Sequence, residues 1–547
     1  MENSGFSLKK LTLRMALCFI VLPLLFLISM IYQNSVSKII QEYSAQSAFK
    51  EKAKNLTVLP KIIESEGHSD KLLGGILASG FDSESCISRY ESSLYRKTST
   101  HKPSSYLISK LRKYEKRHKH CGPGTEFYNK AVKGLDSSHA NVTSECSYIV
   151  WLPSNGLGNR IVSMTAAFLY SLVTDRVLLV HHGTDMADLF CEPFPNTSWF
   201  LPSDFPLIDQ FDSSKMRNNY SYGALLKNNN TNTSTLKPPG FLFLYLAYNY
   251  DESDKLFYLD QNQDFLRKVP WLILRSDQYF VPYLFLIKSF QNELNRLFPD
   301  KETVFHNLSR YLFHPSNQAW GLITRFYQAY LARADEIIGL QIRLFDPKSN
   351  PSDLVMKQIL SCTENENLLP KLVNQKNTVT SASRNQTLKA ILVASLHSEY
   401  YTNLKNIYWT KPTATGEAIG VYQPSNEEYQ HFGDNMHNIK AWAEMYVLSL
   451  SDVLVTSSWS TFGYVAQGLG GLRPWIMFMP DNRNIPNPPC RRVLSMEPCF
   501  HYPPSYDRDK NVRDENVDLG EHVTQCEDVS WGVKLVNSKN NLFTAKH

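Results

Sequence analysis

Hydrophobic positions fall into one long run near the N-terminus and two series of short runs separated by polar turns. The long run, residues 15–32, carries no charge and would cover about 27 Å of hydrocarbon as a helix. Basic residues precede it at 9–14, and Glu42 is the first acidic residue after it, so a cytosolic tail is expected at 1–14. A cleaved signal peptide is the alternative, but the run is too long for one and ends in the bulky residues 30–32. The pattern therefore favours an uncleaved signal anchor with the rest of the chain in a lumen.

The first series of short runs has the order strand, helix, strand. A β-rich run at 148–152 is followed by a turn at 153–159 and by helical spacing of apolar residues over 160–174. A second apolar run lies at 177–180. This order predicts a βαβ unit.

The second series begins at Ile338, from which aliphatic and polar residues alternate up to Leu344. Further runs predict strands at 391–394, 453–455 and 475–478 and helices at 440–450 and 462–469. A helix-rich segment at 281–334 separates the two series. We therefore expect an α/β protein with two Rossmann-like halves facing a cleft, behind a transmembrane helix. The expected divisions are a tail (1–14), an anchor (15–32), a stem (33–78), an N-terminal lobe (79–335) and a C-terminal lobe with its tail (336–547).

Composition narrows the class of protein. With 43% apolar and 12% aromatic residues among 547, the chain can bury large cores, which excludes a disordered polypeptide. Its net charge of +5 is too dilute for a nucleic-acid binder. A mean hydropathy of −0.31 excludes a polytopic membrane protein. Eight cysteines follow the anchor without any CxxC pair, which indicates disulfides in an oxidising compartment, with their pairing left open.

A glycine-containing turn, Gly156 to Asn159, lies between the first predicted strand and its helix. Backbone N–H groups at a helix N-terminus favour an anion such as phosphate. The turn is neither a dinucleotide fingerprint, since Ile161 stands where a third glycine is needed, nor a P-loop. A plain tight connection, with Asn159 capping the helix, is the alternative.

Arg343 is placed near the carboxyl end of a predicted strand, opposite its aliphatic face. Open α/β sheets bind ligands at that edge, and a guanidinium can hold a diphosphate through two hydrogen bonds. The alternative is an ion pair with Asp346 or another acidic residue. The hydroxyl-rich turn 456–461 lies at another strand end, where its side chains could cap a helix or donate to phosphate.

Four long motifs resemble the plant xyloglucan-type α1,2-fucosyltransferase family. They are GLGNRIVSMTAAFLYSLVTDRVLLV (156–180), IGLQIRLF (338–345), MHNIKAWAEMYVLSLSDVLVTSSWSTFGYVAQGLGGLRPWIMF (436–478) and PCRRVLSMEPCFHYPP (489–504). The stretch 72–97 resembles the N-terminal boundary of that family, so the likeness runs from about 72 to 535. The resemblance implies a variant GT-B fold and a type II Golgi membrane enzyme. It also implies inverting transfer of fucose from GDP-fucose, without a required metal, to O2 of a terminal galactose on xyloglucan, or to arabinogalactan glycans.

The resemblance also assigns roles to residues. Arg343 matches the donor-binding arginine of the family, and Ser460, Thr461 and Phe462 match the turn that holds the diphosphate. Asn159 and Arg160 match the positions beside Gly156 and Gly158 in the glycine loop. Glu444 lies one helix upstream of the turn at 460–462, and from this position, rather than from the resemblance, we predict that it contacts ribose or guanine. The C-terminal lobe would then hold the donor and the N-terminal lobe the acceptor.

Asp277 is the candidate general base, since it follows the apolar run that starts at Trp271 and matches an acidic position of the family at the acceptor site. The alternative is an aspartate that caps a turn. The sole DxD pattern, 507–509, lies in a polar segment, and we interpret it as a solvated loop rather than a metal bridge.

The expected partners are GDP-fucose, a cell-wall polysaccharide or arabinogalactan acceptor, and the Golgi membrane through residues 15–32. Nucleic acid is not among them, and self-association is left open. Two other functions compete with transfer to a glycan. One is a catalytically silent glycan-binding or complex-organising paralogue, which retention of the donor motifs disfavours. The other is a protein O-fucosyltransferase.

Overall fold

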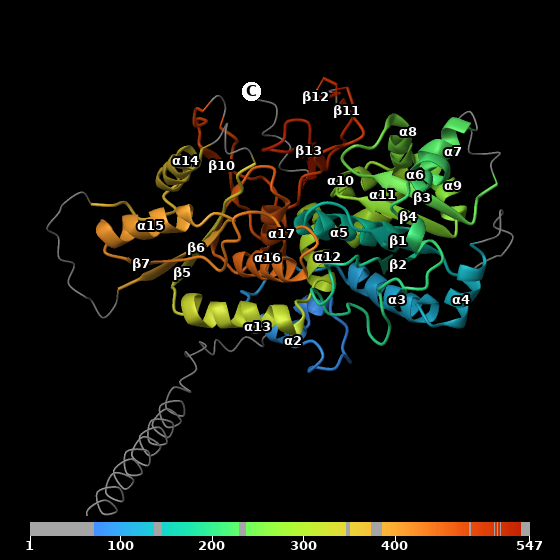
Figure 1. Ribbon diagram of the computed structural model, residues 1–547, viewed down its shortest axis with the longest axis horizontal. Helices are drawn as coiled ribbons and strands as arrows, with labels where there is room; N and C mark the ends of the chain where they lie inside the picture. Colours follow the sequence, from blue (N-terminus) through green and yellow to red (C-terminus); the bar gives the residue numbers. More distant parts are fainter. Residues whose placement is uncertain are drawn as a thin grey trace, which may run out of the picture. The chain divides into compact units, whose positions relative to one another are not determined.

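The computed structural model describes residues 70–135, 145–228, 237–345, 351–373, 386–480, 483–507, 509–510, 512–514 and 516–537, which belong to a unit that starts at Ser69. This unit contains two α/β lobes (Figure 1). The predicted tail, the anchor 15–32 and most of the predicted stem lie outside the described residues. Within the described ranges, no helix has both the length and the apolar character that a bilayer crossing requires.

A four-stranded parallel sheet forms the centre of the N-terminal lobe, with the order β2-β1-β4-β3. The two central strands pair in register, Tyr148 opposite Trp271, and both consist largely of buried apolar residues, as expected when helices cover both faces. The four strands of this sheet are β1 (Tyr148–Leu152), β2 (Val177–Val180), β3 (Phe241–Leu246) and β4 (Trp271–Ser276). The predicted βαβ unit is present.

Helix α5 (Leu157–Val173) connects β1 to β2 and is buried along almost its whole length, because helices of both lobes pack on it. The other helices of this part of the chain are α2 (Ser88–Glu91), α3 (Ser105–Cys121), α4 (Glu126–Lys133), α6 (Ser214–Tyr220), α7 (Tyr222–Asn228), α8 (Glu252–Lys255), α9 (Asp260–Lys268), α10 (Val281–Leu284), α11 (Lys288–Leu297), α12 (Val304–Leu312) and α13 (Asn317–Phe326).

A six-stranded sheet forms the C-terminal lobe, with the order β10-β9-β8-β5-β6-β7, and only β10 runs antiparallel. Its strands are β5 (Glu336–Gln341), β6 (Leu388–Ala394), β7 (Ala418–Tyr422), β8 (Val453–Ser457), β9 (Trp475–Met477) and β10 (Cys490–Arg492). Its helices are α14 (Ser352–Asn365), α15 (Glu399–Thr410), α16 (Asn435–Leu448) and α17 (Thr461–Gly470). Two short hairpins follow: β11 (Tyr506–Asp507) with β12 (Val512–Arg513), and β13 (Val523–Gln525) with β14 (Val533–Leu535).

The lobes share one hydrophobic core. Helices α5 and α17 pack against each other, and α12 packs on both. The segment after β10 returns to the N-terminal lobe, where Tyr250 donates to the Tyr502 carbonyl at 2.7 Å and Tyr283 hydrogen-bonds Ser505 at 2.9 Å. The part of the chain assigned to the C-terminal lobe therefore also completes the surface of the other lobe.

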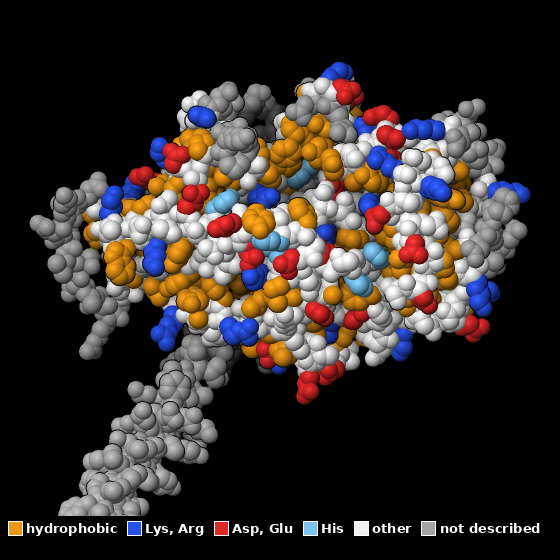
Figure 2. Space-filling model, viewed as in Figure 1, with side chains coloured by type: hydrophobic (Ala, Val, Ile, Leu, Met, Phe, Trp, Pro, Cys, Tyr) orange, Lys and Arg blue, Asp and Glu red, His pale blue; other side chains and the backbone are white. Residues whose placement is uncertain are grey.

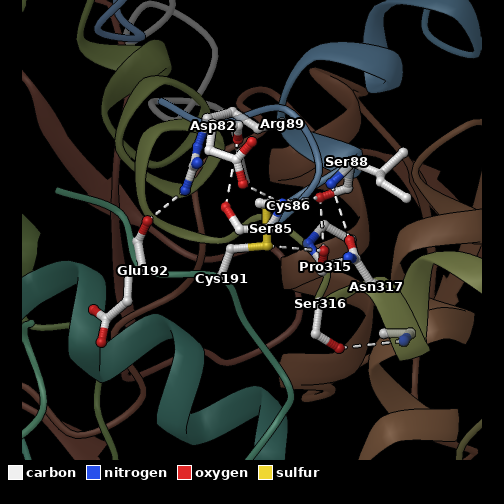
Figure 3. Close-up of a disulfide and its surroundings, with 12 residues drawn as sticks. Asp82, Ser85, Cys86, Ser88, Arg89, Cys191, Glu192, Pro315, Ser316 and Asn317 are labelled. Carbon is white, nitrogen blue, oxygen red and sulfur yellow. Dashed lines mark hydrogen bonds between the residues drawn. A yellow bond between two sulfur atoms is a disulfide. The ribbon is translucent and has the colours of Figure 1, made fainter. Parts of the chain in front are cut away.

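Four disulfides pair the eight cysteines that follow the anchor, which confirms the expected framework: Cys86–Cys191, Cys121–Cys146, Cys362–Cys490 and Cys499–Cys526. The first fastens the N-terminal segment to the chain after β2 (Figure 3). Around it, Ser88 donates to the Pro315 carbonyl at 2.6 Å and Arg89 donates to the Glu192 carbonyl. The folded part starts earlier than the predicted boundary at 79, because Leu73, Ile76 and Leu77 are already buried.

Several element boundaries differ from the predictions by one to five residues, and two of these differences bear on the site. Strand β5 ends at Gln341 rather than Leu344, so Arg343 lies in the loop after the strand. Helix α16 begins five residues earlier than predicted, because Asp434 caps it by accepting from the N–H groups of Met436 and His437.

Charges on the surface are mixed. On the face shown in Figure 2, the described basic and acidic side chains are interspersed and form no continuous basic stripe.

Candidate active site

A pocket of about 480 Å³ opens between the two lobes, at the carboxyl ends of their parallel strands. Its walls come from the loops after β1, β3 and β4 in one lobe, and from α16 and the loops after β5, β6, β7 and β8 in the other. His501 and Tyr502 also line it. Ligands of open α/β sheets bind at this edge. Among the predicted residues, the lining includes Gly156, Gly158, Asn159, Asp277, Arg343, Glu444, Ser460, Thr461 and Phe462.

The first turns of α5 and α17 meet at this pocket. A Cβ atom on Gly158 would lie 2.6 Å from Thr461 Oγ1 and 2.9 Å from the Phe462 backbone nitrogen, so only glycine permits this approach. The N-cap residues, Gly156 for α5 and Ser460 for α17, provide no side-chain hydrogen bond to the first turn. Two helix N-termini therefore offer N–H groups and positive dipole ends to the same space, which suits an anion.

Asn159 links the two lobes. Its Oδ1 accepts from the Thr461 hydroxyl at 3.0 Å, and its Nδ2 donates to the Asp277 backbone carbonyl at 3.1 Å. One side chain thus fixes the relative positions of α17, α5 and the loop after β4.

The Asp277 carboxylate is held by three donors and is only 2% exposed. Its Oδ1 accepts from Gln278 Nε2 at 2.7 Å and from the Tyr248 N–H at 3.0 Å, while Oδ2 accepts from Asn155 Nδ2. Burial raises the pKa of Asp277, and these hydrogen bonds partly oppose that increase. A carboxylate has about four acceptor positions, so one more donor, from a ligand, can still be accommodated.

Arg343 provides a positive side chain to the pocket. Its backbone N–H donates to Ser457 Oγ at 2.9 Å, which ties the loop after β5 to the end of β8. Its guanidinium lies 5.6 Å from the ring centre of Phe345, and among the described residues no carboxylate pairs with it; Asp346 lies outside them. Burial lowers the pKa of Arg343 from its usual value, yet the group stays charged at neutral pH. A partly buried cation of this kind suits a diphosphate.

The hydroxyl-rich turn before α17 has an unusual backbone conformation. Trp459 has a φ of +60°, which is rare for a bulky residue, and its N–H donates to Asp528 Oδ2 at 2.9 Å. Its ring lines the pocket beside His501. The strained turn places Ser460 and Thr461 at the entrance to α17.

Glu444 is a buried carboxyl group in the wall of the pocket, 8% exposed. Burial raises its pKa to about 8, and the Ser425 hydroxyl donates to it. A ligand with N–H donors would favour its ionised form.

A family model described as xyloglucan fucosyltransferase matches residues 44–509. The chain belongs to this family. It is 55% identical over 470 residues to a galactoside 2-alpha-L-fucosyltransferase of Pisum sativum, covering 86% of this chain and 83% of the relative. An Arabidopsis thaliana protein of the same name is 54% identical over 532 residues, covering 96% and 93%.

A solved relative has the same architecture as this fucosyltransferase-family chain. The structure of an Arabidopsis thaliana FUT1 mutant in complex with GDP is 56% identical, with a TM-score of 0.78, and the match covers 85% of this chain and all of that one. The α/β fold with parallel sheets is therefore that of a fucosyltransferase, as the sequence motifs implied.

One residue that was predicted to bind the donor nucleotide lies outside the pocket lining of this family member. Arg160 is not part of the pocket lining; its Nη1 donates to Asp185 Oδ1 at 2.7 Å and its Nε to the Asn155 carbonyl at 2.8 Å. Asp185 also accepts from Asn438 of α16 at 3.1 Å. The guanidinium of Arg160 is therefore already bound by the buried carboxylate of Asp185. Through these contacts Arg160 fixes the glycine loop and helps to join the two lobes.

The sequence analysis assigned no role to several lining residues. They are Tyr248, Gln341, Ser395, Ser425, Glu427, Gln430, His437, Lys440, Trp459, His501 and Tyr502. Six of them lie within the quoted motifs 338–345, 436–478 and 489–504, so the motifs were the available signal, and the other five come from segments outside the motifs. The DxD segment lies elsewhere: Asp507 belongs to the hairpin β11–β12 and pairs with Lys510 at 3.2 Å.

Proposed function

We propose that the protein transfers L-fucose from GDP-fucose to O2 of a terminal galactose, or to arabinose, on plant cell-wall glycans such as xyloglucan or arabinogalactan. The observation that carries the proposal is the convergence of two uncapped helix N-termini and the Arg343 guanidinium in one pocket. The names of the two relatives and the GDP in the solved relative support the acceptor and donor classes. The silent alternative has no observation in its favour.

On the donor side, we propose that Arg343, Ser460, Thr461 and Phe462 hold the diphosphate, with Gly156 and Gly158 supplying backbone N–H groups. Bond cleavage at the fucose carbon places negative charge on GDP. N–H groups that are already oriented and a partly buried guanidinium stabilise that charge without reorganising, and each well-placed donor of this kind typically contributes about 10²–10³-fold in rate. No metal is then required to neutralise the leaving group.

On the acceptor side, we propose inversion, with the acceptor hydroxyl attacking from the face opposite GDP. Asp277 would accept its proton at the remaining acceptor position of the carboxylate, and Asn159 keeps the Asp277 loop in place. The raised pKa of Asp277 suits a base. Tyr248 is 45% exposed beside Asp277, and its ring lies 6.3 Å from that of Tyr502, so the pair offers an aromatic surface to a sugar.

We also propose that the enzyme is a single-pass type II protein of the Golgi membrane, anchored by residues 15–32 with its catalytic body in the lumen. The support is the uncharged run and the basic residues before it.

The function is tested by GDP release from GDP-fucose with galactosylated xyloglucan, arabinogalactan and folded protein acceptors. Turnover with a glycan and persistence of activity in excess EDTA are expected. Asp277→Asn should lower kcat by at least about 10²-fold and leave GDP binding nearly unchanged, since general-base catalysis contributes that much. Turnover only with a protein acceptor, or an absolute manganese requirement, would contradict the proposal.

A further inference from the structure

A cluster of two imidazoles and a carboxylate lies on the loop between β7 and α16. Glu427 Oε2 is 3.5 Å from His437 Nδ1 and 4.0 Å from His431 Nε2, and the three donor atoms lie within 4.8 Å of one another. His437 stands in the first turn of α16, while the other two residues belong to the loop that precedes it. The cluster therefore joins a loop to a helix.

An unsatisfied atom points into this cluster. His437 is 6% exposed, and its Nδ1 is buried without a hydrogen-bond partner, with Glu427 Oε2 at 3.5 Å as an ion-pair contact. A buried ring nitrogen without a partner is costly. A cation at the centre of the cluster would satisfy it.

The chemistry of the donors selects the kind of cation. Two imidazoles and one carboxylate are a zinc ligand set, whose nitrogen and oxygen distances of about 2.0–2.2 Å place neighbouring donors somewhat over 3 Å apart. The observed separations are wider, at 3.5 and 4.0 Å with the third no more than 4.8 Å, so the side chains must move closer together when a metal binds. Lys440 donates to Oε1 of Glu427, so Oε2 is the oxygen left for a metal and the lysine orients the carboxylate.

The described part of the chain contains two other groups of potential metal ligands, and neither is available. Each includes the two sulfurs of a disulfide, Cys121–Cys146 in one and Cys499–Cys526 in the other. A cystine sulfur is not a thiolate and does not ligate zinc in this way.

We propose that Glu427, His431 and His437 form a site for one Zn²⁺-class cation at the rim of the pocket, separate from the Arg343 side that would hold the diphosphate. Three protein ligands leave the fourth position open to water. Glu427 and His437 line the pocket, so the site lies at its edge and the cation ties the loop that carries Ser425 to α16. The proposal is independent of the reaction proposed above, which needs no metal.

The test uses tag-free protein of residues 69–547, the unit that folds around both lobes, treated with EDTA and dialysed. Calorimetric titration with ZnCl₂ should give one saturable equivalent, and titration with CoCl₂ should give the intense visible absorption of a low-symmetry Co²⁺ centre. Zn²⁺ should also raise the melting temperature, because it binds only the folded state.

Three variants locate the site. His431→Gln and His437→Gln should each weaken Zn²⁺ binding by at least about 10-fold and remove the thermal shift, since loss of one ligand leaves two. His182→Gln is the matched control, because that histidine is exposed and lies in the other lobe. The melting temperature without metal reports whether each variant folds, and His431→Gln changes a partly exposed residue, so it keeps the test valid if His437→Gln does not fold. No saturable binding by the wild type, or equal binding by all variants, would overturn the proposal.

Discussion

Thr461 donates its hydroxyl to Asn159 Oδ1 at 3.0 Å, and this hydrogen bond joins the two lobes at the first turns of α17 and α5. Because the same two turns supply the N–H groups of the pocket, the bond keeps both anion-binding helix ends aimed at one point.

Thr461→Val, which keeps the shape and removes the hydroxyl, should weaken GDP binding by roughly 5- to 30-fold, the cost of about 1–2 kcal/mol for an acceptor left unsatisfied. Calorimetry with GDP measures it. Thr410→Val, at the exposed end of α15, is the control and should bind like wild type. Equal affinity in both variants would show that the lobes are positioned without this bond.

Gly158→Ala should separate the two helix ends. The added Cβ would stand 2.9 Å from the Phe462 backbone nitrogen, which cannot move without shifting α17. We expect a lower melting temperature and a loss of GDP affinity of at least about 10-fold, since overpacking a tight contact typically costs about 1–3 kcal/mol. In Gly321→Ala, the new Cβ meets only the flexible end of Arg325, and neither property should change.

Glu444 should make GDP binding depend on pH. Its pKa is about 8 in the free protein, and guanine N–H donors would favour its ionised form, so affinity should rise from pH 7 to about pH 8 and then level off. Glu444→Gln should remove this slope, as measured by GDP titrations between pH 7 and 8.5. The same pH dependence of GDP affinity in the variant would show that a group other than Glu444 titrates.

Glu497 should make stability depend on pH. It is buried with Tyr279 donating to it at 2.5 Å and the Phe305 N–H at 2.8 Å, and burial raises its pKa to about 8. Between its unfolded pKa near 4.5 and this value, the folded state binds more protons than the unfolded state. The free energy of unfolding therefore falls as pH rises through that window, by at most about 1.4 kcal/mol per pH unit.

Glu497→Gln should flatten this dependence, measured by denaturant unfolding at pH 6 and pH 8. Glu364→Gln, on the exposed face of α14, is the control and should retain the wild-type difference. A variant as pH-dependent as wild type would show that Glu497 does not carry the effect.

The sequence predicted the parts of the fold that local signals determine. Strand β1 has the predicted limits 148–152 because a buried apolar run meets a Pro-Ser-Asn-Gly turn. The alternation of apolar and polar residues predicted the end of β5 wrongly. Ile342 and Leu344 keep the pattern after the strand has ended at Gln341. Periodicity reports side-chain burial, and burial continued into the loop.

The residues of the site could likewise be predicted only where local sequence signals determine their position. The glycine loop and the turn at 460–462 could be predicted because each lies at a strand end next to a helix. The partner of Arg160 could not, because Asp185 is brought to it only by the packing of the chain after β2. Tyr248 likewise reaches the pocket through its backbone bond to Asp277, a contact that no local pattern contains.

The central claim, that the Arg343 guanidinium neutralises GDP in the pocket between the lobes, is tested most directly by GDP and guanosine titrations of wild type and Arg343→Ala. The account predicts that the variant loses at least about 100-fold in GDP affinity, in line with about 3 kcal/mol for a charged hydrogen-bond pair, and binds guanosine like wild type. Equal GDP affinity in both proteins, with unchanged fucose transfer, would contradict it.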